Sequence, residues 1–334
     1  MKFGPVPVQQ ACGAVVAHSV ALPEGRLRKG HVLTARDITA LEAAHIMQIT
    51  VARLEQGDVN ENAAAEALAQ NLITGNLGLE ATRPFTGRVN LIAQGAGVAV
   101  LDTDAIGVVN AIDPMITVAT VPAHHQLRGG DMVATIKVIS YAVPQTALAQ
   151  AVSVAQGAIA LATAVHTQAT LIISEIPGGA GDKGRAAIEA RLTALGVALA
   201  VVVLVPHSQE ALKAAIEKAQ TSLVLILTGS ATSDIHDVAP SALRHAGGEV
   251  TRFGMPVDPG NLLFLGRRDT PLSGTQQVIG LPGCARSPAL NGADWVLSRV
   301  ICGIEVTSAD IAAMGVGGLL KEIPTRPHPR QKHE

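Results

Sequence analysis

Aromatic residues and net charge are both scarce in this chain. Of its 334 residues only 2% are aromatic, with a single Trp and a single Tyr. Lys and Arg total 25 against 27 Asp and Glu, which gives a net charge of −2. Proteins that bind nucleic acid rely on a positive surface and, for single strands, on aromatic side chains that stack with bases. The sequence therefore predicts no nucleic-acid partner.

Cysteine is also rare, and the sequence shows no apolar leader. The three cysteines, Cys12, Cys284 and Cys302, are odd in number and form no C-x-x-C pair. We therefore expect no disulfide framework, no tightly bound structural metal and a reducing, cytoplasmic location. Residues 138–174 carry no Asp, Glu, Lys or Arg, but Gln, Ser, Gly and Thr interrupt their middle part, 147–165. We expect a buried or interdomain helix there and no membrane partner.

Hydrophobic residues make up 48% of the chain, enough for well-filled cores. The length fits about two domains. We expect an N-terminal α+β module over residues 1–160, an α/β domain over 161–316, and a Pro- and charge-rich tail over 317–334 that is disordered.

Strand and helix patterns alternate regularly in the second half. Apolar strand patterns at 170–174, 198–205 and 223–228 are each followed by a helical pattern, at 184–195, 209–220 and 237–245 respectively. Further strands are expected at 262–265 and 277–281, and a further helix at 287–301. Such β-α-β units predict a doubly wound, mostly parallel sheet.

The first half mixes its elements less regularly. Helices are expected at 35–44, where Thr34 and Asp37 have the spacing of a capping box, and at 61–73. Strands are expected at 98–101, 116–120 and 132–139, and a hairpin-like connection near Pro23 and Lys29.

Three loops rich in small and polar residues follow predicted strands, at 177–184, 229–236 and 282–287. In open α/β sheets ligands bind at the carboxyl ends of the strands, and each of these loops leads into a helix whose N-terminus favours an anion. Together they indicate a phosphate-bearing ligand, although each loop by itself is equally explained as a turn. None matches the P-loop or the dinucleotide-binding pattern.

The middle loop contains two carboxylates, Asp234 and Asp237. They could hold Mg²⁺ beside a polyphosphate or accept hydrogen bonds from a heterocycle. Equally, residues such as Ser233 and Asp234 could cap the next helix, with Asp237 in its first turn. The spacing alone leaves both interpretations open.

The same residues resemble a known family. Thr228–Pro240 reads T-G-S-A-T-S-D-I-H-D-V-A-P and is similar to the T-G-G-x-(S/G)…D loop of the molybdopterin-binding domain. Molybdopterin adenylyltransferases and molybdenum insertases share that domain. Asp258–Gly266 is similar to the insertase P-G-K-P-L-x-F-G, and Gly280–Ser287 to G-L-P-G-N-P-x-S. Asp182–Gly184 more weakly matches D-[ST]-N.

The N-terminal half resembles the family less. Segments 11–17 and 28–34 are similar to segments that insertases carry before their ligand domain. Residues 314–320 resemble the junction of bacterial proteins in which such a domain precedes a nucleotidyltransferase (glycosyltransferase-like) domain.

The resemblance implies a protein of molybdenum-cofactor biosynthesis that binds molybdopterin or its nucleotide form. Nucleotidyl transfer with Mg²⁺ and ATP or CTP, or molybdenum insertion, would be the reaction of an enzyme. However, Ser230, Asn261 and Cys284 replace a glycine, a lysine and an asparagine of the family, which favours a non-catalytic carrier that serves a separate nucleotidyltransferase. A third alternative is the same scaffold with another nucleotide-like ligand. A homo-oligomer is expected.

The resemblance also assigns roles to residues of this chain. The catalytic candidates are Asp237, Asp234 and Asp182, of which Asp237 and Asp234 are also the Mg²⁺ candidates. The ligand-binding candidates are Thr228, Gly229, Ser230, Ala231, Thr232, Ser233, Pro259, Gly260, Asn261, Gly280, Leu281, Pro282, Gly283, Cys284 and Ser287.

Overall fold

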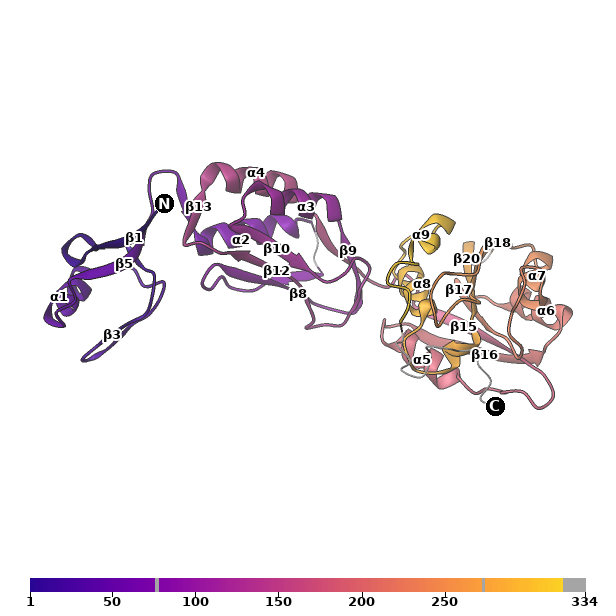
Figure 1. Cartoon of the computed structure of the whole chain (residues 1–334). Coiled ribbons are helices and arrows are strands. Elements are labelled where there is room, and N and C mark those ends of the chain that lie inside the picture. The colour runs from indigo at the N-terminus through magenta and orange to yellow at the C-terminus, as the bar shows by residue number, and fades with distance from the viewer. Residues whose placement is uncertain (76–77, 272–273, 321–334) are drawn as a thin grey trace, which may run out of the picture. The chain divides into compact units, whose positions relative to one another are not determined.

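A computed structural model describes residues 1–75, 78–271 and 274–320 of the chain (Figure 1). The chain forms two compact units: residues 1–95 with 99–161, and residues 96–98 with the chain from 162 onward. Both contain helices and strands, so the predicted mixed α/β architecture is confirmed. Most of the tail expected to be disordered, residues 321–334, lies outside the described residues.

The first unit begins with a small β-rich segment. Its elements are β1 (Lys2–Pro7), the short 3-10 helix η1 (Val8–Gln10), β2 (Val15–Val16), the hairpin β3 (Val20–Leu22) and β4 (Gly25–Leu27), α1 (Ala35–Ala43) and β5 (Gln48–Arg53). The three-stranded sheet has the order β1-β5-β2, with antiparallel pairing. The predicted helix is confirmed as α1, and its N-cap Thr34 forms a capping box with Asp37.

The Asp37 carboxylate accepts hydrogen bonds from the Thr34 hydroxyl (2.6 Å), the His31 ring (2.9 Å) and the Thr34 amide (2.8 Å). These bonds lower the pKa of Asp37 from 3.8 to about 2. Because the folded-state pKa lies below the unfolded one, the stabilisation is present above pH ~4 and is lost as the pH falls towards 2. We expect Asp37→Ala to cost about 1–2 kcal/mol of unfolding free energy at pH 7 and little near pH 2.

The only tyrosine in the chain, Tyr141, provides the readout for this prediction. Its ring is buried against Val15, Ala17 and Ala52, and its hydroxyl donates to the Ala17 carbonyl at 2.7 Å. Urea unfolding followed by Tyr absorbance at pH 7 and near pH 2 measures the difference. Asp104→Ala, an exposed first-turn acid of another helix, is the matched control. A cost for Asp37→Ala that does not shrink in acid would contradict the prediction.

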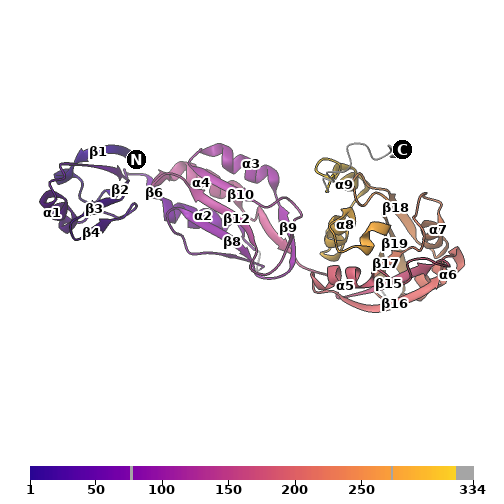
Figure 2. The same ribbon diagram turned by 60° about the horizontal axis from the view of Figure 1, so that its bottom comes forward.

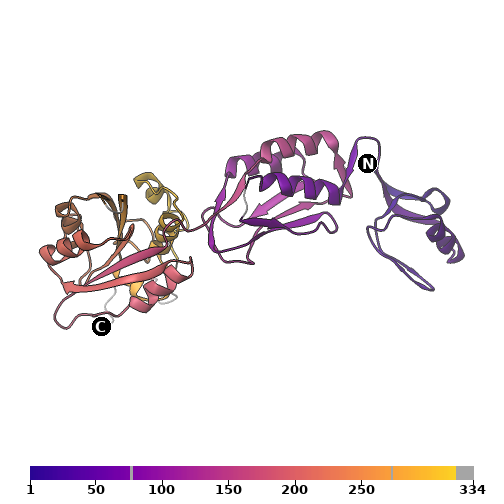
Figure 3. The ribbon, with the colours of Figure 1, turned by 180° about the vertical axis from the view of Figure 1, so that it is seen from behind.

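The rest of the first unit is a layer of helices on β-sheet. Its strands are β6 (Asp58–Asn60), β7 (Leu79–Ala81), β8 (Arg88–Ala93), β9 (Gly97–Leu101), β10 (Ile116–Thr120), β11 (Gln126–Leu127), β12 (Met132–Val138), β13 (Ala142–Pro144) and β14 (Ile159–Ala162), and its helices are α2 (Glu61–Leu72), α3 (Thr103–Ile112) and α4 (Gln145–Ala155). The main sheet has the order β10-β12-β8-β7. The helices lie together on one face of it (Figures 1 and 3).

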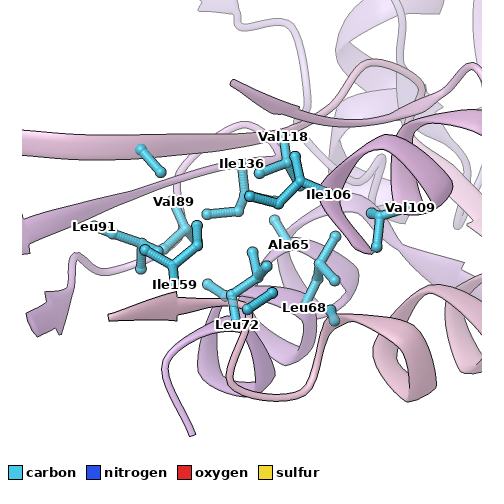
Figure 4. Close-up of a cluster of buried hydrophobic side chains, with 14 of the residues drawn as sticks. Ala65, Leu68, Leu72, Val89, Leu91, Ile106, Val109, Val118, Ile136 and Ile159 are labelled. Atoms are coloured by element: carbon cyan, nitrogen blue, oxygen red, sulfur yellow. The ribbon is translucent and has the colours of Figure 1, made fainter. Parts of the chain in front are cut away.

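Aliphatic side chains fill the space between these helices and strands. Leu68 and Leu72 of α2 face Val89 and Leu91 of β8, with Ile159 of β14 beside them (Figure 4). The core thus uses Ala, Val, Leu and Ile, as the composition requires.

One expectation for this unit is wrong. The uncharged stretch 147–165 is not one helix, because α4 ends at Ala155 and β14 begins at Ile159. Gly157 between them adopts a positive φ of 68°, which ends the helix. Among the residues that the structure describes, no helix is both long and apolar enough to traverse a bilayer.

The second unit is built on one six-stranded sheet. Its elements are β15 (Gln168–Glu175), α5 (Arg185–Thr193), β16 (Ala198–Pro206), α6 (Gln209–Lys218), β17 (Leu223–Leu227), α7 (Val238–His245), β18 (Glu249–Phe253), β19 (Phe264–Thr270), β20 (Gly274–Leu281), the short 3-10 helix η2 (Gly283–Arg286), α8 (Gly292–Ile301) and α9 (Ser308–Ala313). The order is β16-β15-β17-β20-β19-β18. The pairs β16–β15, β15–β17 and β17–β20 are parallel, whereas β19 runs antiparallel to both neighbours.

Successive β15 side chains point to opposite faces of this sheet. Leu171 and Ile173 pack in one core with α5 and α8, while Ile172 packs in another with α6 and α7. Helices therefore cover both faces, so the strands read as continuous apolar runs. The sequence predicted every α5-to-α8 helix to within a few residues, but it missed β18 and α9.

Candidate ligand-binding site

The segments that the sequence singled out meet at one edge of the six-stranded sheet. The loops 176–184, 228–237 and 282–287 follow β15, β17 and β20, whose parallel carboxyl ends are neighbours. The segment 258–263 joins them because it leads into β19, and Phe264 at the start of β19 lies opposite Gly280 near the end of β20. The structure thus assembles four stretches that are distant in sequence.

The loop after β17 is folded around its own threonines. The buried Thr228 donates its hydroxyl hydrogen to the Ser230 carbonyl at 2.6 Å, and its oxygen lies 3.3 Å from the Thr232 hydroxyl. Within the described part of the chain, the backbone N–H groups of Ser230, Ala231 and Thr232 have no hydrogen-bond acceptor. Adjacent free amides of this kind are suited to bind an anion.

Gly229 brings this loop close to the end of β15. Its amide donates to the Ser174 hydroxyl at 3.1 Å, and the same hydroxyl lies 2.8 Å from His207 Nδ1. A Cβ atom at position 229 would lie 2.7 Å from the Ser174 carbonyl oxygen. A larger residue would therefore push the loop away from β15.

The carboxylates of this loop accept hydrogen bonds from nearby backbone amides. Asp237 is the N-cap of α7: one oxygen accepts from the Val238 amide at 2.7 Å and the other from the Ser233 amide at 2.9 Å. Asp234 accepts from the His236 amide at 2.7 Å. Of the two interpretations left open by the spacing, capping is the one seen, with Asp237 itself as the cap. Asp182 lies exposed in the loop before α5.

Arg286 ties three of the loops together, and sequence reasoning missed it. Its guanidinium donates to the carbonyls of Gly181 (3.3 Å), Lys183 and Thr228 (3.0 Å). Gly184 packs so closely on it that a Cβ there would lie 2.8 Å from Arg286 side-chain atoms. The signal that could have found it is a single arginine within the small-residue block that follows a predicted strand.

A second arginine, Arg191 of α5, holds the loop after β20 in place through hydrogen bonds to its backbone. It forms a partly buried ion pair with Asp294 and donates to the carbonyls of Ala285 (3.0 Å), Ser287 (2.9 Å) and Ala289 (3.0 Å). Ser287 is itself exposed. The two arginines together give this loop its shape.

The remaining predicted residues fall into two groups. Gly280 and Leu281 are buried at the end of β20, and Pro282 is buried directly after it, before η2. Gly283 and Cys284 are exposed at the start of η2. Desolvation raises the pKa of the Cys284 thiol, an effect to which the Asp258 charge adds, so the structure favours a small loop residue over a reactive thiolate.

Pro259, Gly260 and Asn261 lie beside the start of α8. The Pro259 carbonyl accepts from the Gly292 amide at 2.8 Å, and the Asn261 side chain donates to the Met255 carbonyl at 3.2 Å. A Cβ at Gly260 would lie 2.7 Å from the Gly292 nitrogen. This segment is therefore held by backbone contacts.

No preassembled metal site is visible among the residues described. The structure there contains no group of three or more His, Cys, Asp or Glu side chains placed to hold an ion. Mg²⁺ commonly binds through one or two carboxylates plus substrate phosphates. A metal at Asp234 and Asp237 would therefore depend on oxygens supplied by the ligand.

A partly open cavity of about 430 Å³ lies at the other end of the strands. His166, Thr251, Gln277 and the segment 303–308 line it, and none of the predicted site residues does. His166 bonds to the Ser222 hydroxyl at 2.7 Å, and burial lowers the pKa of its ring. We place the site at the carboxyl edge because the free amides and the converging loops are there.

The second unit is thus an α/β domain with free backbone amides at the carboxyl edge of its sheet. Residues 163–300 match the family model of the probable molybdopterin binding domain. This part of the chain therefore contains a probable molybdopterin binding domain, as the four sequence blocks predicted. Residues 5–53 match a domain of unknown function. No curated protein matches the chain.

Two solved structures are similar to parts of the chain. A molybdenum cofactor biosynthesis protein from Pyrococcus furiosus is 11% identical over 91% of this chain, with a TM-score of 0.27. The chain spans 66% of that protein's length. A second structure, titled a putative molybdenum cofactor biosynthesis protein from Corynebacterium diphtheriae, is 14% identical and has a TM-score of 0.29. The match covers 44% of this chain and 99% of that protein. TM-scores this low assign neither fold nor activity.

Proposed function

We propose that the second unit binds molybdopterin, or its nucleotide form, at the carboxyl edge of a doubly wound sheet. The observation that carries this proposal is the run of acceptor-free amides at Ser230, Ala231 and Thr232 in a domain of the molybdopterin-binding family. These amides would receive the terminal phosphate of the pterin. The exposed start of η2, at Gly283 and Cys284, would line the side of the binding site opposite these amides.

The carboxylates would act mainly by shaping the pocket. Asp237 holds the loop by accepting two amides, which leaves lone pairs free for a pterin N–H or a phosphate-bound Mg²⁺. Asp234 and Asp182 are the supporting carboxylates of this proposal. In an enzyme, they would organise Mg²⁺ with ATP or CTP for nucleotidyl transfer, or the site would serve molybdenum insertion.

A carrier without catalysis is the second candidate, and a specific observation favours it. Both Asp237 oxygens are engaged with backbone amides, and Ser230, Asn261 and Cys284 replace the family's glycine, lysine and asparagine. Charge stabilisation at a reacting phosphate is the part of the chemistry that these changes weaken. Such a carrier would pass the pterin to a separate nucleotidyltransferase in the cytoplasm.

The test of the ligand is anaerobic binding of molybdopterin, measured by retention in spin filtration. Wild type should retain the pterin saturably, and Asp237→Asn should bind about tenfold more weakly or worse, because the amide replaces one of the two acceptor oxygens that hold the loop. Asp269→Asn, at the far end of β19, is the matched control and should bind like wild type. Failure of wild type to retain the pterin would show that the scaffold takes another ligand.

The test of catalysis follows from the same samples. Consumption of Mg-ATP or Mg-CTP that requires molybdopterin would identify an enzyme. Retention of the pterin without nucleotide turnover would identify the carrier.

A further inference from the structure

Strand β16 leaves a long apolar edge on the six-stranded sheet. It lies at one end of the strand order, beside β15 only, and Figure 2 shows it at the margin of the unit. Its nine residues, ALAVVVLVP, include no charged or polar side chain. Val201 and Leu204 are 45% and 48% exposed. Edges of this kind are templates for pairing with another strand.

The opposite edge of the same sheet is protected in the usual way. There β18 is only five residues long and carries Glu249 and Arg252. Glu249 also pairs with Arg267 of β19 at 3.1 Å. Short length and charge discourage edge-to-edge association. The contrast between the two edges indicates that β16 has a partner.

The backbone of β16 offers its free groups over a short central stretch. The His207 amide donates to the Glu175 carbonyl of β15 at 2.9 Å. Because backbone groups alternate along a strand, those of Val203 and Val205 also face β15, whereas those of Val202 and Leu204 face outward. On one side Pro206 has no N–H, and on the other the ladder is irregular at Ala200, which has no partner in β15.

We propose that β16 pairs with β16 of a second copy of this chain, antiparallel and about a two-fold axis at Val203. In this register Val202 of each copy lies opposite Leu204 of the other. Each such pair exchanges two backbone hydrogen bonds, so that all outward N–H and C=O groups of the two residues are satisfied. Val203 faces its own symmetry mate at a non-hydrogen-bonded position. The two sheets become one continuous sheet.

Charge favours a second copy as the occupant. A two-fold axis brings two copies of the same strand together, which would place like charges near one another in a charged strand, but β16 has no charges to repel. The same axis runs the two copies of α6 antiparallel on one face. Glu210 near the start of α6 is then directed to the end where Lys218 of the other copy lies.

The size of the edge also fits a dimer. Nine strand residues span about 30 Å. Helices α5 and α6 both contact β16, one on each face, so the edge is three layers thick. With helices about 10 Å in diameter, the edge offers on the order of 800 Å² per copy, the area that a standard specific interface buries.

The first experiment measures mass and cross-linking of the full chain. Light scattering should give twice the chain mass of 34.2 kDa. In a Cys12→Ser, Cys284→Ser background, Val203→Cys should form a disulfide-linked dimer for more than about half of the chains, because non-hydrogen-bonded Cα atoms lie ~4.5 Å apart. Val201→Cys is more exposed but lies opposite residue 205, so it should cross-link several-fold less.

A disruption variant completes the test. Leu204→Lys should halve the mass, since lysine on an edge strand opposes pairing, whereas Val108→Lys, the same kind of change at a 50% exposed valine of α3, should leave the dimer intact. A monomeric wild type overturns the proposal. So does an oligomer that survives Leu204→Lys or that cross-links better through Val201→Cys than through Val203→Cys.

Discussion

Gly280→Ala is expected to destabilise the second unit by about 3 kcal/mol or more. A Cβ atom at this position of β20 would lie 1.9 Å from the Phe264 ring, far inside van der Waals contact. Phe264 on β19 is directly opposite and only 1% exposed, so its ring has no space to withdraw into. Relief would require the ring to leave its rotamer or the two strands to separate.

A double-mutant cycle isolates this clash. Phe264→Leu alone should be destabilising because it leaves a cavity, but with Gly280→Ala the combined cost should be about 1–3 kcal/mol less than the sum. Gly283→Ala, three residues further and with open space around it, should change the stability by less than about 0.5 kcal/mol. Urea unfolding followed by Trp295, the only tryptophan and part of α8, reports this unit selectively. Strictly additive costs would contradict the clash.

The second half of the fold was predictable because its pattern is local. Strands β15, β16 and β17 are mostly apolar runs, and Ser208 marks the start of α6 between β16 and β17. β18 was missed because its sequence, EVTRF, breaks the alternation of polar and apolar residues at Thr251, where the strand has an irregularity in its register. The stretch 147–165 was misjudged because its lack of charge masks the change from helix to strand at Gly157.

The site was predictable in place but not in its contacts. Loops after parallel strands must share one sheet edge, so the sequence could locate residues 228–237 and 282–287 together. Which side chain joins them depends on contacts between residues that are more than 100 positions apart in the sequence. Arg286 reaches Gly181 and Lys183 in this way, and the local pattern marks a lone arginine at 286 but does not reveal which carbonyls it contacts.

Arg286→Ala is expected to reduce molybdopterin binding by about 10- to 100-fold. The change leaves the carbonyls of Gly181, Lys183 and Thr228 without their shared donor, so the loops after β15 and β17 lose their connection to the loop after β20. Lost charge-assisted hydrogen bonds of this kind cost about 1–3 kcal/mol, and the ligand must then order the loops when it binds. Arg286→Lys should be intermediate, because one ammonium group cannot reproduce the planar fork of the guanidinium.

Hydrogen exchange separates the role of Arg286 from the identity of the ligand. In Arg286→Ala, the hydrogen-bonded loop amides of Gly179, Lys183, Gly229 and Ser233 should exchange faster without any ligand. Those of the β17 core should not, since only the connection between loops is lost. Arg267→Ala removes an exposed arginine that pairs with Glu249, and neither exchange nor pterin retention should change. Unchanged exchange in Arg286→Ala would refute the role of this residue, whereas faster exchange with undiminished retention would show that molybdopterin does not depend on the joined loops.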